Sequence, residues 1–352
     1  MRRAPQKDSR PGLEEFSLSP RRLKIQGGAG RRGTNRMRPY ILAGWVFAVL
    51  SAGCPGVQAQ AGAPGPHPPP AAMEGLRLLY SGDPDAAIEQ FRQIQAQSPD
   101  DPLGFILEAE GRWWKIYCES AEFKWGMTDA WHRQKLPGDQ AYFQLADKAI
   151  ALAETRLKQA DSAEMHLHEG LAFALKAQLF SLRDEKRAEA RAGVRAREHF
   201  LKALALDPSL ADADMGLGLY NYYVDTLSTI AKVLRFFMGI PGGSKTEGVR
   251  QLRLAAEHGA ITSAEARFYL VKNLRNIDRD YEQALKVMEP LAAQYPSNAI
   301  FQLVLGDLNA KLGRTDKAAA HYRAAAALPV PDAACREHIQ MLSRAALAAL
   351  GV

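Results

Sequence analysis

The stretch Gly239–Thr246, GIPGGSKT, approaches a phosphate-binding loop of the form G-x-x-x-x-G-K-T. Ser244 replaces the glycine before the lysine, and that glycine matters because the loop backbone must curl closely around phosphate. Such a loop also follows a β-strand, whereas residues 231–238 have a helical pattern. We therefore interpret residues 239–246 as a connection between helices and expect no nucleotide cofactor.

His166, His168 and Glu169 are the residues that most resemble a metal-binding set. On a helix, residues i and i+2 point about 200° apart, whereas helical zinc ligands use i and i+4. We predict a solvated helix edge here and no bound metal. The sequence contains no H-E-x-x-H motif, no G-x-S-x-G motif and no Cys/His pair at metal-ligand spacing, so we expect no catalytic residues.

Trp113, Trp114 and Tyr117 belong to a set of aromatic residues concentrated between positions 113 and 131. Trp113 and Tyr117 share one face of a helix, while Trp114 turns away from it by about 100°. Because Trp and Tyr are good anchors for a binding partner, these three residues are anchor candidates. Packing of an irregular insertion against the second hairpin is the alternative.

The elements that carry these residues are amphipathic helices, since apolar residues recur at i, i+3 and i+4 from residue 71 onward. Four segments repeat one pattern of a small residue, a large one, an apolar one and proline. The four copies are Ala87, Phe91, Ile94, Pro99; Ala196, Phe200, Ala203, Pro208; Ala284, Met288, Leu291, Pro296; and Ala318, Tyr322, Ala325, Pro329. Ala284 and Ala318 are 34 residues apart, which is a period of helical-hairpin repeats.

This pattern resembles the tetratricopeptide repeat (TPR), and the resemblance covers most of residues 71–330. It implies an all-α, TPR-like solenoid with a capping helix at Ala333–Leu350. The helical hairpins, about six in number, are expected at 71–99, 100–160, 162–208, 209–259, 263–296 and 297–330. The middle three exceed 34 residues and therefore contain insertions.

The resemblance also implies a concave groove that holds a protein or peptide partner. In TPRs the groove is lined by fixed positions of the first helix of each repeat. The residues at or next to those positions in this chain are Asp212, Met215, Tyr222, Tyr223, Tyr269, Asn273, Asn276, Asp307 and Lys311. Asn273 is expected to hydrogen-bond the backbone of an extended peptide. The basic and amide residues with which some TPRs clamp a C-terminal carboxylate are not reproduced, so no specificity for C-terminal peptides is expected.

Cys118 and Cys335 are the two cysteines of the repeat region. Two cysteines do not make a disulfide framework, and in a solenoid these two would lie near opposite ends. We predict two buried, unpaired thiols.

Basic residues are concentrated at the beginning of the chain. The whole chain has 45 Lys and Arg against 39 Asp and Glu, a net charge of +6; residues 1–59 alone have a net charge of +8, which leaves −2 for the rest. The repeat region therefore lacks a basic block that could follow a phosphate backbone. We expect no nucleic-acid partner.

The residues before the repeats divide into three segments. Residues 1–36 are rich in Arg, Gly, Pro and Ser and are expected to be disordered, or not translated if Met37 is the start. Residues 37–61 have the basic, apolar and small-residue regions of a signal peptide. Residues 62–72 are a Pro/Gly linker ahead of a repeat domain at 73–350.

The stretch Leu50–Cys54, LSAGC, resembles a lipoprotein signal in which Leu stands one position too early. Lipidation of Cys54 and ordinary cleavage near Ala59 or Ala61 both stay open. A second route to a membrane is Leu219–Ile240, a long apolar segment that contains Lys232 and Arg235. Burial as a long repeat helix is our expectation for it, and in-plane contact with a membrane is the alternative.

The sequence thus predicts an exported adaptor of the periplasm or outer cell envelope in bacteria, without enzymatic activity, that binds a protein segment in its groove. The alternative is a membrane-associated structural lipoprotein, attached through a lipid anchor at Cys54 or through the 219–240 helix. An enzyme with its site in the insertions is a third hypothesis.

Overall fold

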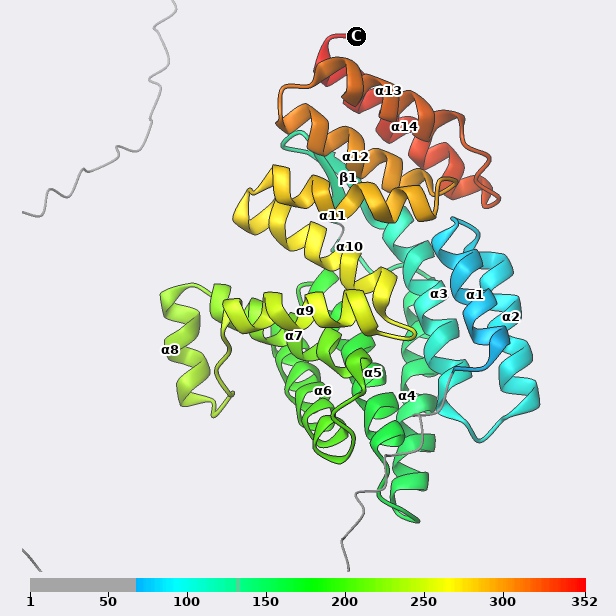
Figure 1. Cartoon of the computed structure of the whole chain (residues 1–352), viewed down its shortest axis with the longest axis vertical. Helices are drawn as coiled ribbons and strands as arrows, with labels where there is room; N and C mark the ends of the chain where they lie inside the picture. Colours follow the sequence, from blue (N-terminus) through cyan, green and yellow to red (C-terminus); the bar gives the residue numbers. More distant parts are fainter. Residues whose placement is uncertain (1–67, 132) are drawn as a thin grey trace, which may run out of the picture. The chain divides into compact units, whose positions relative to one another are not determined.

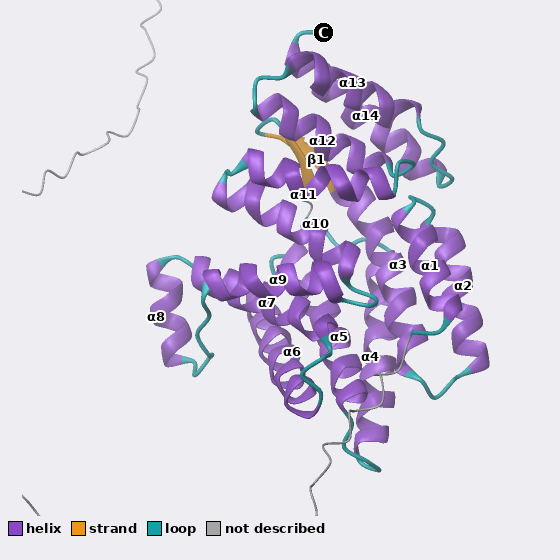
Figure 2. Ribbon diagram, in the orientation of Figure 1, coloured by secondary structure: helices purple, strands orange, loops and turns teal. Residues whose placement is uncertain are grey.

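The computed structural model describes residues 68–131 and 133–352 of the 352-residue chain. These residues belong to one compact unit and are almost entirely helical, with one two-stranded sheet in the described part (Figure 2). Residues 1–36, the predicted signal peptide and Cys54 lie outside the described residues.

The elements of the described part are, in chain order, α1 Pro70–Tyr80, α2 Pro84–Gln97, α3 Pro102–Ser120, β1 Ala121–Lys124, β2 Met127–Ala130, α4 Gly138–Leu157, α5 Ala163–Leu182, α6 Lys186–Leu206, α7 Ala211–Thr226, α8 Thr229–Phe237, α9 Lys245–His258, α10 Ser263–Asn273, the π-helical turn η1 Leu274–Asp278, α11 Tyr281–Gln294, α12 Ala299–Lys311, α13 Thr315–Ala327 and α14 Ala333–Leu350.

Successive helices pack as hairpins, which confirms the predicted all-α, TPR-like solenoid (Figure 1). The pairs are α1 with α2, α3 with α4, α5 with α6, α7 with α9, α10 with α11, and α12 with α13, followed by α14 as the cap. Helix α1 begins at Pro70, inside the predicted linker, because proline at the first helical position has a backbone angle already suited to a helix.

The repeated small and large residues hold each hairpin together. Phe91, Phe200 and Tyr322 are buried at the helix contacts. A Cβ atom at Gly306 would lie 2.4 Å from the ring of Tyr322, so glycine at this position is what lets α12 approach α13. The sequence pattern therefore encodes the distance between paired helices as well as their hydrophobic faces.

The solenoid curls until its first hairpins meet its last ones. The side-chain amide of Asn298 donates a hydrogen bond to the carbonyl of Tyr80 at 2.9 Å. Cys118 at the end of α3 forms a disulfide with Cys335 in α14, with 5.8 Å between their Cα atoms. The prediction of two unpaired thiols is wrong, because curvature brings together two ends that a straight array would keep apart.

The segment 219–240 is not one long buried helix. Helix α7 ends at Thr226, and the nine residues of α8 have no buried member. Our expectation of a long repeat helix is wrong here. Residues 238–244 connect α8 to α9, so the predicted connection at 239–246 is found, except that Lys245 and Thr246 already belong to α9. Ser244 caps α9 by accepting a hydrogen bond from the backbone of Glu247.

Among the described residues, none of the helices combines the length and the apolar character that crossing a membrane requires.

Candidate functional site

The β-hairpin between α3 and α4 lies on the inner face of the solenoid. Its strands pair Ala121 with Ala130 and Lys124 with Met127, which leaves Trp125 and Gly126 as a two-residue turn. Strand β2 packs against α3 and α12, and β1 against α14. Because α3 and α12 are the first helices of their repeats, the chain's own hairpin occupies the face where a partner's segment was predicted.

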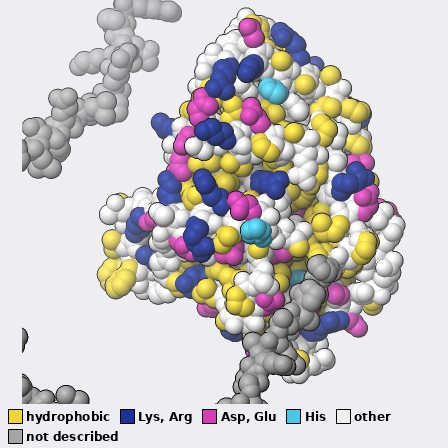
Figure 3. Space-filling view, in the orientation of Figure 1, with side chains coloured by type: hydrophobic (Ala, Val, Ile, Leu, Met, Phe, Trp, Pro, Cys, Tyr) yellow, Lys and Arg dark blue, Asp and Glu magenta, His cyan; other side chains and the backbone are white. Residues whose placement is uncertain are grey.

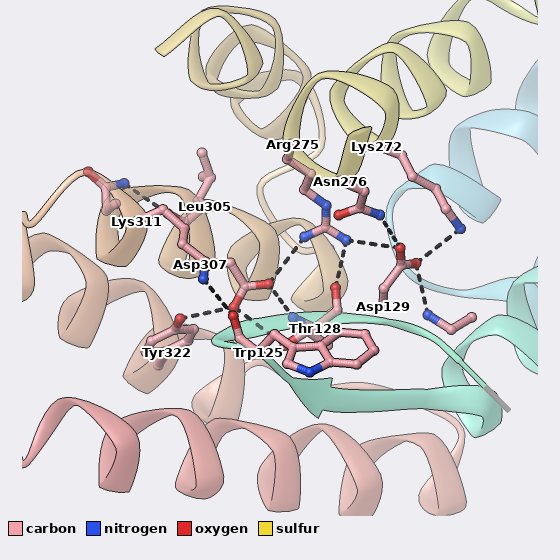
Figure 4. A network of polar contacts seen from close by, with 12 residues as sticks. Trp125, Thr128, Asp129, Lys272, Arg275, Asn276, Leu305, Asp307, Lys311 and Tyr322 are labelled. Atoms are coloured by element: carbon pink, nitrogen blue, oxygen red, sulfur yellow. Dashed lines mark hydrogen bonds and ion pairs between the residues drawn. The ribbon is translucent and has the colours of Figure 1, made fainter. Parts of the chain in front are cut away.

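Asp307 of α12 and Arg275 of η1 hold the hairpin by its backbone (Figure 4). The Thr128 N–H donates to Asp307 Oδ2 at 2.6 Å, and Arg275 Nη2 donates to the Thr128 carbonyl at 2.6 Å. Arg275 Nη1 and the Tyr322 hydroxyl also donate to Asp307, at 3.2 and 2.9 Å. Both backbone groups of Thr128 are thus satisfied by side chains, as in the recognition of an extended peptide.

Asp129 forms the second half of the network. The Tyr117 hydroxyl donates to it at 2.8 Å, and Lys272 Nζ lies 3.0 Å from its carboxylate. The amide of Asn276 donates to the other carboxylate oxygen, and Arg275 lies 3.7 Å away. A buried carboxylate is stable when it is paired and fully hydrogen-bonded, and Asp129 meets that condition.

The two acids of the network titrate differently. Burial raises the pKa of Asp307 to about 7, although Arg275 acts against this effect. Burial also acts to raise the pKa of Asp129, but Lys272 and Arg275 outweigh it and hold that pKa below its usual value. Asp129 is therefore the lasting counter-ion of Arg275 at neutral pH. Both carboxyls are at most 1% exposed, so no substrate reaches them in this structure.

The π-helical turn η1 explains why two consecutive residues, Arg275 and Asn276, both reach the hairpin. A π-helical turn takes one more residue than an α-helical turn, and such turns occur frequently at functional sites. The turn ends at Arg279, whose φ of 56° is in the left-handed region. The side-chain amide of Asn273, just before it, is buried without a hydrogen-bond partner among the described residues.

The turn of the hairpin presents Trp125 to solvent. Its side chain is 74% exposed, and φ is 53° at Trp125 and 69° at Gly126. Two positive φ angles define a type I′ turn, in which Asn-Gly is the preferred sequence. Lys311 Nζ supports the turn by donating to the Trp125 carbonyl at 2.5 Å, and the ring of Trp131 contacts the indole edge-on.

Three predicted groove residues therefore contact the hairpin: Asn276, Asp307 and Lys311. Of the others, Tyr223 keeps 36% of its surface exposed, whereas Asn273 is 1% exposed and the expected peptide hydrogen bond of its amide has no room in this structure.

The remaining predicted groove residues support the fold. Asp212 accepts the backbone N–H groups of residues 260–262 and so fixes the connection between α9 and α10. Met215 is in the core. The Tyr222 hydroxyl donates to the Asn273 carbonyl at 3.3 Å, and the Tyr269 hydroxyl accepts from Gln178.

Trp113, Trp114 and Tyr117 are buried, so the structure assigns these anchor candidates to the core. Trp114 packs against Phe268 of α10 and Phe301 of α12, with ring centroids 5.0 and 5.9 Å apart. These rings lie on α3, the first helix of the second hairpin, and Trp114 packs against helices of the fifth and sixth hairpins, so the expected packing of an insertion against the second hairpin does not describe them either. Of the same aromatic set, Trp125 is the ring that faces solvent.

His166, His168 and Glu169 are buried rather than solvated, so that prediction is wrong. Helix α5 is covered on several sides, by α4, α6 and α7. His166 Nδ1 lies 3.0 Å from His199 Nδ1, and His199 Nε2 lies 3.1 Å from Glu169. Burial lowers the pKa values of His168 and His199 to about 4 and raises that of Glu169 to about 7. In the part of the chain that the structure describes, no group of three or more residues is arranged to hold a metal.

Sequence reasoning missed Thr128, Asp129 and Arg275, which form the centre of the network. The available signal was the segment 121–130, AEFKWGMTDA, where Phe123 and Thr128 flank the Trp125-Gly126 pair. Aromatic and β-branched residues around a glycine-containing pair favour a β-hairpin. The segments on both sides have the periodicity of helices, so the short strand pattern between them was not recognised.

Fold and comparisons together define a TPR-type repeat protein. A tetratricopeptide-repeat family model matches residues 278–332, which covers α11 to α13. The model of the family described as "Regulator of microtubule dynamics protein 1-3" matches residues 88–300, more than half of the chain, and the chain therefore belongs to that family.

No curated protein matches the chain significantly in sequence. Among solved structures, the crystal structure of yeast Tom70 aligns with 80% of this chain and 89% of that chain, at 10% identity and a TM-score of 0.27.

Proposed function

We propose that the chain is an exported adaptor that binds a protein partner, with the turn of the β-hairpin as its anchor. The observation that carries this proposal is Trp125, a large apolar side chain that is 74% exposed on a rigidly supported turn. Tryptophan is among the residues that contribute most to binding when a partner covers them. The repeats act as the frame that presents it.

The backbone of Trp125 supports this interpretation. A non-glycine residue in the left-handed region costs about 1–2 kcal/mol, and a bulky aromatic residue is uncommon there. Strain of this kind is often found where a side chain serves a function. Asn at position 125 would suit the turn better, so the stability of the turn does not account for the tryptophan.

The disulfide between Cys118 and Cys335 supports export. Disulfides form and persist in oxidising compartments such as the periplasm and are rare in the cytosol. Together with the predicted signal peptide at 37–61, this favours a location in the cell envelope. Mass measurement of the protein from cells, after alkylation under non-reducing conditions, tests the bond; modification of both cysteines would argue against export.

The family description supports protein binding as the activity. It names regulators of microtubule dynamics, and microtubules are protein polymers. TPR arrays serve as interaction scaffolds, so an adaptor fits this fold better than an enzyme does. Co-sedimentation with polymerised tubulin shows whether this chain shares such a partner or has another one.

In-cell photo-crosslinking tests the adaptor. In one strain a photoreactive residue replaces Trp125, and in a second strain it replaces Tyr223 in the predicted groove. In a third strain it replaces Leu201, which is exposed on α6 and serves as the control. We expect one dominant protein to be captured from position 125. Capture from position 223 alone would favour a partner that enters the groove in place of the hairpin. Capture of lipid, or of no specific protein from either position, would overturn the adaptor.

A further inference from the structure

Helix α8 exposes its apolar face. Ile230, Val233, Leu234 and Phe237 are spaced as i, i+3, i+4 and i+7 and form one stripe, and each is between 51% and 79% exposed. Phe236 and Met238 extend the stripe at the end of the helix. Figure 3 shows these side chains as a hydrophobic patch over α8, at the left edge of the molecule.

The polar side of α8 faces the body of the protein. Lys232 Nζ lies 3.2 Å from Asp225, and Arg235 Nη1 donates to the Ile240 carbonyl at 2.8 Å. At the base of the insertion, the Tyr220 hydroxyl donates to the Pro241 carbonyl and Asp225 accepts the backbone N–H of Lys245. Surface helices usually bury their apolar side. Here polar contacts hold the helix in the reverse orientation.

Basic residues flank the stripe of α8. Lys232, Arg235 and Lys245 lie between Asp225 and Glu247, with Lys232 paired to Asp225 and Lys245 to Asp278. On α6, the Arg197 guanidinium lies 5.5 Å from the ring centroid of Tyr220, whose hydroxyl donates to the Pro241 carbonyl beyond α8. An apolar stripe with phenylalanine at its end and basic residues around it is typical of helices that lie in the interface of an anionic membrane.

The shape of α8 favours a bilayer over a second copy of the chain. The helix projects from the body (Figure 1), and the side chains of its stripe are exposed. Stable protein interfaces use roughly 20–30 residues on each side, and the stripe offers six. Nine residues span about 13 Å, well short of the ~30 Å hydrocarbon core of a bilayer, so the helix lies in the interface and does not cross it.

We propose that α8 docks the protein on the surface of an anionic phospholipid bilayer, with the stripe from Ile230 to Met238 inserted among the lipid chains. Lys232, Arg235 and Arg197 of α6 then lie on the headgroup side of the helix. This contact is independent of a lipid at Cys54 and of the partner that Trp125 contacts. It orients the repeats on the membrane, whichever way the N-terminus is processed.

An environment-sensitive dye at position 237 tests the insertion. The full chain, with Cys54→Ala in every sample, receives either Phe237→Cys or Met341→Cys, the latter being exposed on α14. With vesicles of phosphatidylglycerol and phosphatidylcholine, we expect a blue shift of the dye at 237 and none at 341. Pure phosphatidylcholine vesicles should give a much smaller shift at 237.

Vesicle flotation gives an independent measure. Phe236→Ser combined with Phe237→Ser should lower the partition coefficient onto anionic vesicles by about tenfold or more. Equal shifts at 237 and 341, equal shifts with neutral vesicles, or unchanged flotation of the double variant would overturn the proposal. A dye shift that occurs without vesicles and disappears on dilution would also overturn the proposal, because it would indicate pairing with a second copy of the chain. Protection of α8 by a protein partner would overturn it as well.

Discussion

The β-hairpin and α8 are both insertions into the repeat array, but the hairpin is buried and α8 is exposed. Thr128 and Asp129 of the hairpin are buried inside the solenoid, and side chains from η1 and α12 satisfy their polar groups. Helix α8 stays outside, with its apolar stripe in solvent and its basic side against the body.

The comparison shows which contacts allow an insertion to be buried in the fold. The hairpin has complementary partners for its backbone and its acid, so burying it leaves few unmet polar groups. Helix α8 has polar contacts that fix its position but no apolar surface to cover its stripe. One insertion therefore stabilises the protein, and the other leaves an apolar surface exposed.

Asp307→Ala should produce the largest effect, because it removes the acceptor shared by Thr128, Arg275 and Tyr322. Asp129 still pairs with Arg275, but three buried donors lose their acceptor, which at roughly 1–3 kcal/mol each gives a loss of about 3–5 kcal/mol. Urea denaturation measures this loss against Asp225→Ala, which removes the half-exposed partner of Lys232 and of the Lys245 backbone N–H and should cost far less. Similar losses in the two variants would contradict the contrast between the insertions.

Cys118→Ser with Cys335→Ser should lower the free energy of unfolding by about 2–5 kcal/mol, since the bond closes a long loop next to the hairpin. Thermal and urea unfolding measure the change. Reductant should destabilise the original protein in the same way and leave the double variant unaffected. If reductant leaves the original protein unchanged, the bond does not contribute to stability.

His168 should make stability fall at acidic pH. Burial holds its pKa at about 4, although Asp101 acts to raise it, whereas the unfolded value is ~6.5. Between these two values the unfolded chain binds a proton that the folded chain does not, so stability is lost as pH falls from 6.5 towards 4.

His168→Met should remove about 2 kcal/mol of the stability difference between pH 7 and pH 5. Comparing the variant with the original protein is necessary because the raised pKa values of Glu110 and Glu169, about 7, act in the opposite direction. An unchanged difference between the two pH values would show that His168 is not the group responsible.

Trp125→Asn should raise the free energy of unfolding by about 1 kcal/mol, since Asn tolerates the left-handed region and suits a type I′ turn. The same change should abolish crosslinking to the partner from a probe placed nearby. Trp125→Ala should abolish it as well, without the gain in stability. A less stable Asn variant would mean that contact with Trp131 outweighs the backbone strain.

Phe237→Ser should have the smallest effect on stability, within about 0.5 kcal/mol, because the ring contacts little in the folded protein. Phe268→Ser in the inner aromatic cluster should cost about 3 kcal/mol or more. Chemical denaturation without lipid compares the two. A large loss for Phe237→Ser would show that α8 packs against the body in solution.

Much of the fold could be predicted because its signals are local. Ala318, Tyr322 and Pro329 fix one hairpin by spacing alone, and the six hairpins and the cap follow from repetition of the pattern. The candidate site could not be predicted in the same way. Asn276, Asp307 and Lys311 follow from their repeat positions, but the hairpin that they contact comes from an insertion outside the repeat.

The sequence by itself determined most of the helices and their pairing, since these depend on residues close together in the chain. The tertiary structure decided what the curvature brings together: Cys118 with Cys335, Asp129 with Arg275, and His166 with His199. These contacts join residues that are 33 to 217 positions apart along the chain. Helix periodicity does not specify such contacts, because they depend on small angles between hairpins that add up along the array.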